Sequence, residues 1–264
     1  LEAAQDGLDG RARGSLVHQT AALLWRQLQG SVGLAALDGA AIERLCAAAA
    51  AEAVAGLRRE RDLSDAYARL EQQRLARLFV RWLAVERERA VAFTVERLEQ
   101  DTEVSLAGHT LRLRPDRIDR LADGRLVVLD YKTGRDASLG WFGERPEAPQ
   151  LPLYAVLADE PAAALAYARL RADEVRFVGV ASQDGLLPQV AAWGERESQL
   201  HGAWDELPAR WRIACEALVQ AFAAGDAAVD PKQPRRTCEY CDLSLLCRID
   251  QRLALVEEED HELE

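Results

Sequence analysis

The sequence predicts an α/β fold in which helices flank a central mixed β-sheet, with a helical region at the N-terminus. Apolar residues recur at helical spacing from position 14 to about position 90. Short strand-like runs separated by turn dipeptides follow over positions 93–130. Beyond position 150, helical and strand-like runs are interspersed, which is typical of a mixed α/β domain.

Three helices are expected in the N-terminal region, over positions 14–28, 38–59 and 64–89. Asp38 and Ser64 are candidate N-caps, because their side-chain oxygens can accept a hydrogen bond from a free N–H of the first turn. These helices are expected to pack on the sheet that follows.

The middle of the chain predicts an antiparallel meander of four strands, over 93–98, 102–106, 109–120 and 125–130. Turn dipeptides at 107–108 and 123–124 separate the later strands. The last strand is apolar on both faces, so we expect it in the centre of the sheet. The rest of the pattern predicts a helix at 150–157, strands over 163–170 and 174–181, and a long helix over 195–224.

The 264 residues can form one large domain or two smaller ones, with an ample core in either case. Four parts are expected: a helical part over 1–90, an α/β core over 91–230, a cysteine-rich segment over 231–250 and an acidic tail over 251–264. The chain contains no Met, which suggests that it starts inside a larger gene product.

The formal net charge of −11 argues mildly against nucleic-acid binding, although a basic groove can exist on an acidic protein. No apolar run is long enough to cross a bilayer, and no segment has the pattern of a signal peptide. We therefore expect a cytoplasmic protein that does not associate with membranes.

Two carboxylates and a lysine in the middle of the chain form a candidate catalytic site. Asp130 and Lys132 are two positions apart at a strand end, so their side chains share one face. The turn at 123–124 brings the preceding strand, with Asp116, alongside them. Carboxylate oxygens are suited to Mg²⁺ or Mn²⁺, and a bound metal ion activates water for hydrolysis of a phosphodiester. A neighbouring lysine can position that water or stabilise developing negative charge.

The alternative interpretation is a surface hairpin with an ordinary Asp–Lys ion pair. It is disfavoured because Asp130 ends an apolar strand, and because lysine is scarce. All basic residues of the chain are Arg except Lys132 and Lys232. A lysine at this place therefore suggests a need for a compact ammonium group.

Four motifs, in order, give the sequence a family resemblance. They are Gly14-Ser15-Leu16-Val17-His18, the segment Arg114 to Asp119, Asp130-Tyr131-Lys132-Thr133-Gly134, and Gln150 with Tyr154 four positions later. From about Arg13 to Cys247, the chain resembles the PD-(D/E)XK nucleases of the RecB/AddB-like exonuclease type. The second motif departs from the family pattern, because it has Pro115 before the Asp and lacks the customary Gly.

The resemblance implies a restriction-endonuclease-like core and a role for each motif residue. It implies that the metal ligands are His18, Asp116, Asp130 and the Tyr131 carbonyl. It also implies that Lys132 is the catalytic lysine, and that Gln150 and Tyr154 line the site and contact the DNA strand. Without the resemblance, a lone helical His is most simply a structural residue. Asp119 is expected in an ion pair on the opposite strand face. Glu99 is expected as a solvated strand residue, and the alternative is that it adds an acid near the metal.

Basic residues outnumber acidic ones over positions 110–136. Arg114, Arg117 and Arg135 are candidate DNA contacts, because outward-facing Arg side chains can bind phosphates. A ladder of cross-strand ion pairs is an equally good interpretation of the same pattern.

Cys238, Cys241 and Cys247 form a compact group near the C-terminus. Zinc sites and [4Fe–4S] clusters usually have four ligands, and this group supplies three. In the resembled family, a distant Cys before the first motif completes a [4Fe–4S] cluster, but residues 1–13 contain no Cys. The cluster is thus expected in an intact protein, and in this chain it is expected to be absent, incomplete or replaced by Zn. Cys46 and Cys215 are expected to be buried thiols.

The leading hypothesis is the nuclease domain of a bacterial recombination or DNA-repair protein. It would hydrolyse DNA, most readily at single-stranded ends, together with a helicase domain or subunit. One alternative is a catalytically silent module that uses a nuclease fold to bind DNA. Another is a metal-stapled interaction module, with the cysteine segment as its main feature.

Overall fold

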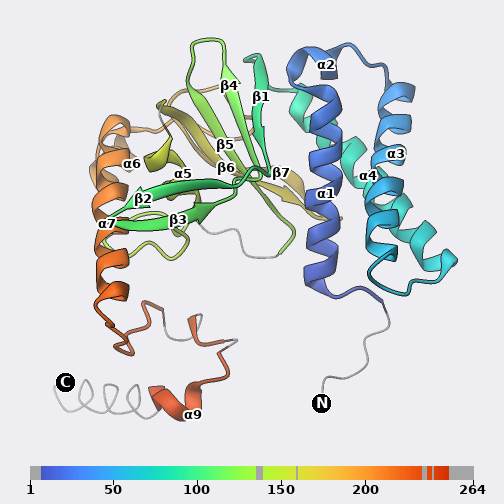
Figure 1. The fold of residues 1–264 in the computed structure, drawn as a ribbon. Helices are drawn as coiled ribbons and strands as arrows, with labels where there is room; N and C mark the ends of the chain where they lie inside the picture. Colours follow the sequence, from blue (N-terminus) through green and yellow to red (C-terminus); the bar gives the residue numbers. More distant parts are fainter. Residues whose placement is uncertain (1–6, 135–138, 159, 234–236, 240, 250–264) are drawn as a thin grey trace, which may run out of the picture. The chain divides into compact units, whose positions relative to one another are not determined.

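The computed structural model describes residues 7–134, 139–158, 160–233, 237–239 and 241–249. The chain forms two compact units, Leu1–Leu218 and Val219–Glu264. The first unit contains the N-terminal helices and the whole β-sheet (Figure 1). Within the described residues, no helix combines the length and apolar character needed to cross a membrane.

The N-terminal region is helical, as expected, and contains α1 (Gly10–Leu28), α2 (Ser31–Ala35), α3 (Gly39–Arg58) and α4 (Asp65–Arg87). Asp38 caps α3 and Ser64 caps α4, each accepting a hydrogen bond from an N–H of the first turn. The first helix begins four positions earlier than expected, because Asp9 caps it through the Ala12 N–H. The short helix α2 was not expected.

The central sheet has five strands in the order β1 (Phe93–Leu98), β4 (Arg117–Leu121), β5 (Leu126–Lys132), β6 (Ala162–Leu170) and β7 (Val175–Ala181). The β5 and β6 strands are parallel, and the other neighbours are antiparallel, so the sheet is mixed. Every residue of β5 except Lys132 is buried, which confirms its predicted central position. At the end of β5, Asp130 and Lys132 pair with β6, whereas the pairing with β4 stops one residue earlier, at Leu129.

The expected four-stranded meander is wrong. The expected strand over 109–120 is two strands, β3 (His109–Leu113) and β4, separated by Arg114-Pro115-Asp116. Pro115 has no N–H for a sheet ladder, which favours a break there. As a result, β2 (Thr102–Leu106) pairs with β3 as a separate hairpin, and β1 pairs directly with β4.

Between β5 and β6 in the chain, α5 (Gln150–Leu157) lies against both strands (Figure 1). The long helix expected over 195–224 is interrupted. It consists of α6 (Glu195–His201), a 3₁₀ turn at Trp204–Glu206 and α7 (Leu207–Ala223). Gly202 ends α6 with a φ of 91°, a conformation that glycine adopts without steric cost. In the second unit, α9 spans Ser244–Cys247.

Two hydrophobic cores cover the two faces of the sheet. Val127 and Leu129 of β5 belong to the core formed with α1, α3 and α4. Val128, between them, belongs to the core that includes Leu151 of α5 and Trp211 of α7. This alternation produces the expected arrangement, a sheet between two helical layers, and it explains why β5 is apolar on both faces.

A buried ion-pair network joins the helices to the sheet. The Arg117 guanidinium, fully buried, bonds to Glu86 Oε1 of α4 and to Asp119 Oδ1, both at 2.6 Å. Arg89 Nη1 completes the network at 2.6 Å from Asp119 Oδ2. Arg117 also stacks on the Trp25 ring of α1, 3.6 Å from its centroid. Asp119 is thus an ion-pair residue, as expected.

Gly179 of β7 lies opposite Ala166 in β6, where the two backbones approach closely. A Cβ at position 179 would lie 2.2 Å from the Leu165 carbonyl oxygen, so the strands would have to move apart. We expect Gly179→Ala to lower the free energy of unfolding by about 2 kcal/mol in urea titrations. Gly39→Ala is the matched control, because a Cβ there meets no atom within 4 Å and alanine favours a helix. Equal effects of the two substitutions would contradict the prediction.

Candidate active site

His18 and Asp116 meet although they are far apart in the sequence. His18 lies in the middle of α1, and its Nδ1 is 3.0 Å from Asp116 Oδ1. The other oxygen of Asp116, Oδ2, accepts a hydrogen bond of 2.7 Å from the Tyr131 N–H of β5. Asp116 can reach both because the break at Pro115 places it just before β4 rather than within a strand. Its carboxylate therefore connects α1 to the end of β5.

Asp130 and Lys132 share one face at the end of β5, as period-two geometry predicts. Lys132 Nζ lies 2.8 Å from Asp130 Oδ2, and the Asp130 side chain is only 2% exposed. The lysine is more accessible, with 35% of its side chain exposed, and its ammonium lies 5.3 Å from the centre of the Tyr167 ring on β6. A deeply buried carboxylate thus holds an ammonium group that solvent and ligands can reach.

Burial and neighbouring charges shift the pKa values of Asp130, His18 and Lys132. Burial and the negative charge of Asp116 raise the pKa of Asp130 to about 6, against the opposing effects of Lys132 and His18. Burial alone would lower the pKa of His18, but hydrogen bonds to Asp116 and Glu99 outweigh it and raise that pKa to about 10. Burial likewise opposes the charge on Lys132, yet the charge of Asp130 raises its pKa above the usual value. Lys132 is therefore a charged hydrogen-bond donor at neutral pH.

Gln150 and Tyr154 lie one turn apart on α5, and Gln150 Nε2 donates to the Tyr154 hydroxyl at 3.2 Å. Burial raises the pKa of Tyr154, and the charges of Asp116 and Asp130 raise it further. Those charges act on Tyr154 only because the α5 residues face the same region as the carboxylates.

Glu99 belongs to the site, which was the second of the two interpretations that the sequence offered for it. Its side chain, only 15% exposed, places Oε1 at 3.6 Å from His18 Nδ1, so the expectation of a solvated strand residue is wrong. Glu99 has a φ of 48° and its N–H bonds to the Pro115 carbonyl, which fixes the chain where it enters the β2–β3 hairpin. Among the described residues, His18, Glu99 and Asp116 are the group of possible ligands close enough to share one ion.

The family model of the PD-(D/E)XK nuclease superfamily matches residues 2–248. The chain belongs to this superfamily. No match was found among curated proteins. The mixed sheet between helical layers is the restriction-endonuclease-like fold expected from the sequence, and PD-(D/E)XK nucleases usually depend on a divalent metal ion. Membership therefore identifies the chain as a nuclease by family.

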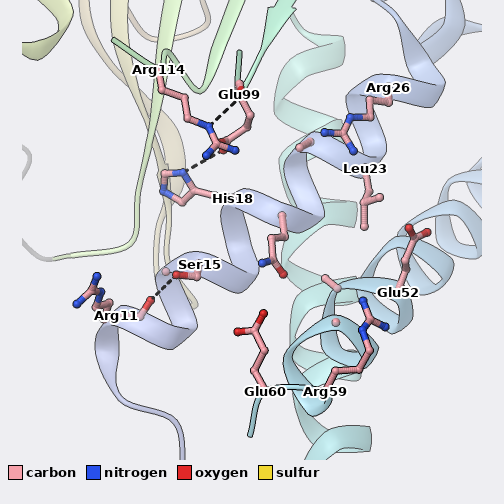
Figure 2. A pocket seen from close by; sticks show the side chains of 15 residues that line it. Arg11, Ser15, His18, Leu23, Arg26, Glu52, Arg59, Glu60, Glu99 and Arg114 are labelled. Atoms are coloured by element: carbon pink, nitrogen blue, oxygen red, sulfur yellow. Dashed lines mark hydrogen bonds and ion pairs between the residues drawn. The ribbon is translucent and has the colours of Figure 1, made fainter. Parts of the chain in front are cut away.

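The candidate DNA contacts have different environments. Arg114 Nε lies 3.0 Å from Glu99 Oε2, and its side chain remains 56% exposed beside the site (Figure 2). Arg117 is buried in the ion-pair network, so the prediction that it faces DNA is wrong. A sequence count of charges cannot detect this, because it contains no information on burial. Arg135 lies outside the described residues.

The cysteines divide into two kinds. Cys46 and Cys215 are buried, as expected, and burial raises the pKa of the Cys215 thiol to about 11. Cys238, Cys241 and Cys247 are partly or fully exposed, and the described residues show no grouping of their three thiols close enough to share one ion.

The chemistry of the donor set fits a divalent cation. Two carboxylates and an imidazole, from Glu99, Asp116 and His18, lie close enough to share one ion, and Asp130 interacts electrostatically with Asp116 and His18 from outside that group. Oxygen-rich sets of this kind suit Mg²⁺ and Mn²⁺. Burial and the neighbouring Asp116 charge raise the pKa of Asp130, and a bound cation would oppose both effects by favouring the ionised carboxylate.

We therefore expect Mn²⁺ to stabilise the protein by about 2.7 kcal/mol at 100 times its dissociation constant. A thermal unfolding series with increasing Mn²⁺ measures this effect. Asp116→Asn is expected to abolish the increase in Tm. Asp123→Asn, which changes an exposed turn residue, is the matched control. An equal Mn²⁺ response in wild type and both variants would exclude Asp116 as a ligand.

Proposed function

We propose that the chain is a metal-dependent deoxyribonuclease that hydrolyses phosphodiester bonds of DNA with Mg²⁺ or Mn²⁺. The observation that carries the proposal is the convergence of His18, Asp116, Asp130 and Lys132 from α1, the start of β4 and the end of β5. Family membership supports the reaction class. An ordinary surface ion pair would not explain why these residues meet within a largely buried site.

Each residue has an assigned role. His18, Asp116, Asp130 and the Tyr131 carbonyl would hold the metal ion, with Glu99 beside His18. When bound, the metal would supply an activated water molecule and neutralise charge on the phosphate. Lys132, held by Asp130, donates hydrogen bonds to a phosphate oxygen or to the attacking water as negative charge develops. The Tyr131 N–H fixes the orientation of Asp116. Gln150 and Tyr154 line the part of the site that the DNA strand would occupy.

The direct test is cleavage of a 5′-labelled single-stranded oligonucleotide by the purified chain. Fragments are expected with Mg²⁺ or Mn²⁺, and none with EDTA. Binding without cleavage in the presence of each metal would instead support the catalytically silent DNA-binding module. Neither binding nor cleavage would contradict the proposed function.

The wider setting is proposed from the RecB/AddB-like resemblance. In this proposal the chain is the exonuclease domain of a larger, cytoplasmic bacterial recombination or repair protein that acts with a helicase. An exonuclease needs a strand end, so a linear single strand should be degraded while a closed single-stranded circle survives. Rapid cleavage of the circle would show endonuclease activity and contradict this part of the proposal.

Cys238, Cys241 and Cys247 are proposed as three ligands of a [4Fe–4S] cluster whose fourth ligand lies outside this chain. Iron and acid-labile sulfide should then appear in a longer natural protein and be lost in Cys241→Ser. Zinc in their place would indicate a different centre. A cluster in a protein that never cleaves DNA would support the metal-stapled interaction module.

A further inference from the structure

A polar groove of about 680 Å³ lies beside α1 and α3, and its lining includes His18, Glu99 and Arg114 of the candidate site (Figure 2). Small residues in its walls leave the space open, namely Gly14, Ala22, Ala53 and Gly56. The volume exceeds what one metal ion and its waters need. The groove therefore has room for an extended ligand that passes the site.

Two arginines of α1 line this groove on either side of His18. Along the helix, Arg11 precedes His18 and Arg26 follows it (Figure 2). At about 1.5 Å per residue, Arg11 lies about 10 Å before His18 along the helix axis and Arg26 about 12 Å after it. A positive charge is thus available on each side of the proposed catalytic centre.

Fold stability does not explain these two arginines. Within the described residues, no hydrogen bond or ion pair engages the side chain of Arg11 or Arg26. By contrast, Arg13 in the same first turn pairs with Glu71. Arg11 also lies at the positive end of the helix dipole, where a basic residue is electrostatically unfavourable. A chain with a net charge of −11 has many acids that could pair with them, yet both arginines are exposed residues that line the groove.

The acids of the groove are unevenly placed. Glu99 is matched by Arg114 and His18. Glu52 of α3 and Glu60, just after that helix, lie on the other wall together with Arg59. The α1 wall is therefore the positive one, and a polyanion is expected to follow α1 rather than α3.

We propose that this groove binds the sugar–phosphate backbone of the DNA strand being cut, with Arg11 and Arg26 contacting phosphates on opposite sides of the scissile one. This proposal rests on the proposed nuclease function and names the path of its substrate. The two arginines are separated by about 22 Å along the helix axis. At a stacked, helical rise of about 3.4 Å per nucleotide, that distance corresponds to six or seven nucleotides, and a more extended strand would cover it with fewer.

The test compares Arg11→Gln/Arg26→Gln with Arg69→Gln/Arg77→Gln. The control pair removes the same charge from exposed positions of α4 that do not line the groove. Binding of fluorescent (dT)12 is measured in EDTA, where cleavage does not occur, over a range of salt concentrations. The groove variant should bind about tenfold more weakly, and its slope of log K against log salt should be flatter by about 1.4, for two lost phosphate contacts. The control should match the wild type.

Two further measurements sharpen the result. The loss should be smaller for (dT)3, because a trimer cannot reach both arginines. Glu60→Gln, which removes negative charge from the opposite wall, should bind (dT)12 more tightly. Wild-type affinity and salt slope in the groove variant, or equal losses in groove and control variants, would overturn the proposal.

Cleavage measurements distinguish failure of the groove proposal from failure of the proposed nuclease function. The ratio of kcat/KM for (dT)12 to kcat/KM for thymidine 5′-p-nitrophenyl phosphate, which is too short to span the groove, should fall about tenfold in the groove variant only. An unchanged ratio would overturn the proposal that the groove binds DNA, and it would leave the proposed nuclease function intact. If the wild type cleaves neither substrate, the nuclease proposal fails, and the binding measurements still decide the groove.

Discussion

Lys132→Ala is expected to lower kcat for DNA cleavage by about 10³-fold, the scale of losing a preorganised charged donor from a reaction centre. Lys132 has a raised pKa and lies beside the buried Asp130 carboxylate, so it carries its charge throughout the neutral range. Single-turnover cleavage of a labelled strand with saturating Mg²⁺ measures the effect. The Mn²⁺-induced increase in Tm should persist, because the substitution removes no proposed ligand.

Two comparisons make this prediction specific. Lys132→Arg should have a kcat for DNA cleavage at least about 100-fold below that of the wild type, because a planar guanidinium cannot take the place of a compact ammonium. Lys232→Ala, which removes the other lysine of the chain, should cleave at the wild-type rate. A wild-type rate of DNA cleavage in Lys132→Ala would show that Lys132 is not the catalytic lysine.

Glu86→Ala is expected to lower the free energy of unfolding by about 3–5 kcal/mol, because it leaves the buried Arg117 guanidinium without one of its two carboxylate partners. Urea titration followed by circular dichroism measures the change. The same network joins α4 to β4 and stacks on Trp25 of α1, so its loss should also weaken the anchorage of the helix that carries His18.

The control for this experiment is an exposed pair of the same chemistry. Arg112 and Glu103 form an ion pair on the β2–β3 hairpin, with side chains 82% and 60% exposed. Glu103→Ala should change stability by about 1 kcal/mol or less, because water solvates both charges. A similar loss in the two variants would show that burial does not determine the value of these pairs.

The elements predicted best have strong local signals. The caps Asp38 and Ser64 and the bounds of β1 and β2 are as expected from the sequence. Two errors arose where a single residue interrupts a regular pattern. Pro115 breaks the expected strand over 109–120, and Gly202 breaks the expected helix over 195–224. Around Gly202, helical spacing is kept by Leu200, Trp204, Leu207 and Trp211, so periodicity alone cannot locate that break. At Pro115 the available signal was the proline itself.

The site was predictable only in part. Period-two geometry is sufficient to place Asp130 and Lys132 together. His18 could be assigned only through the family resemblance, because nothing local links it to a carboxylate 98 positions away. Glu99 was expected mainly as a solvated residue, because its position depends on the hairpin that leaves the sheet at residue 99 and returns at Pro115. Arg117 was misassigned because its partners come from α1, α4 and β4, and only the folded chain brings them together.

The central claim is that one imidazole and several carboxylates bind a divalent cation beside Lys132. A crystal soaked in Mn²⁺ and measured at the manganese absorption edge tests it directly. The predicted result is an anomalous peak within about 2.5 Å of carboxylate oxygens of both Asp116 and Asp130, a usual metal–oxygen bonding range. An ordered site without such a peak, or with manganese bound only elsewhere, would contradict it.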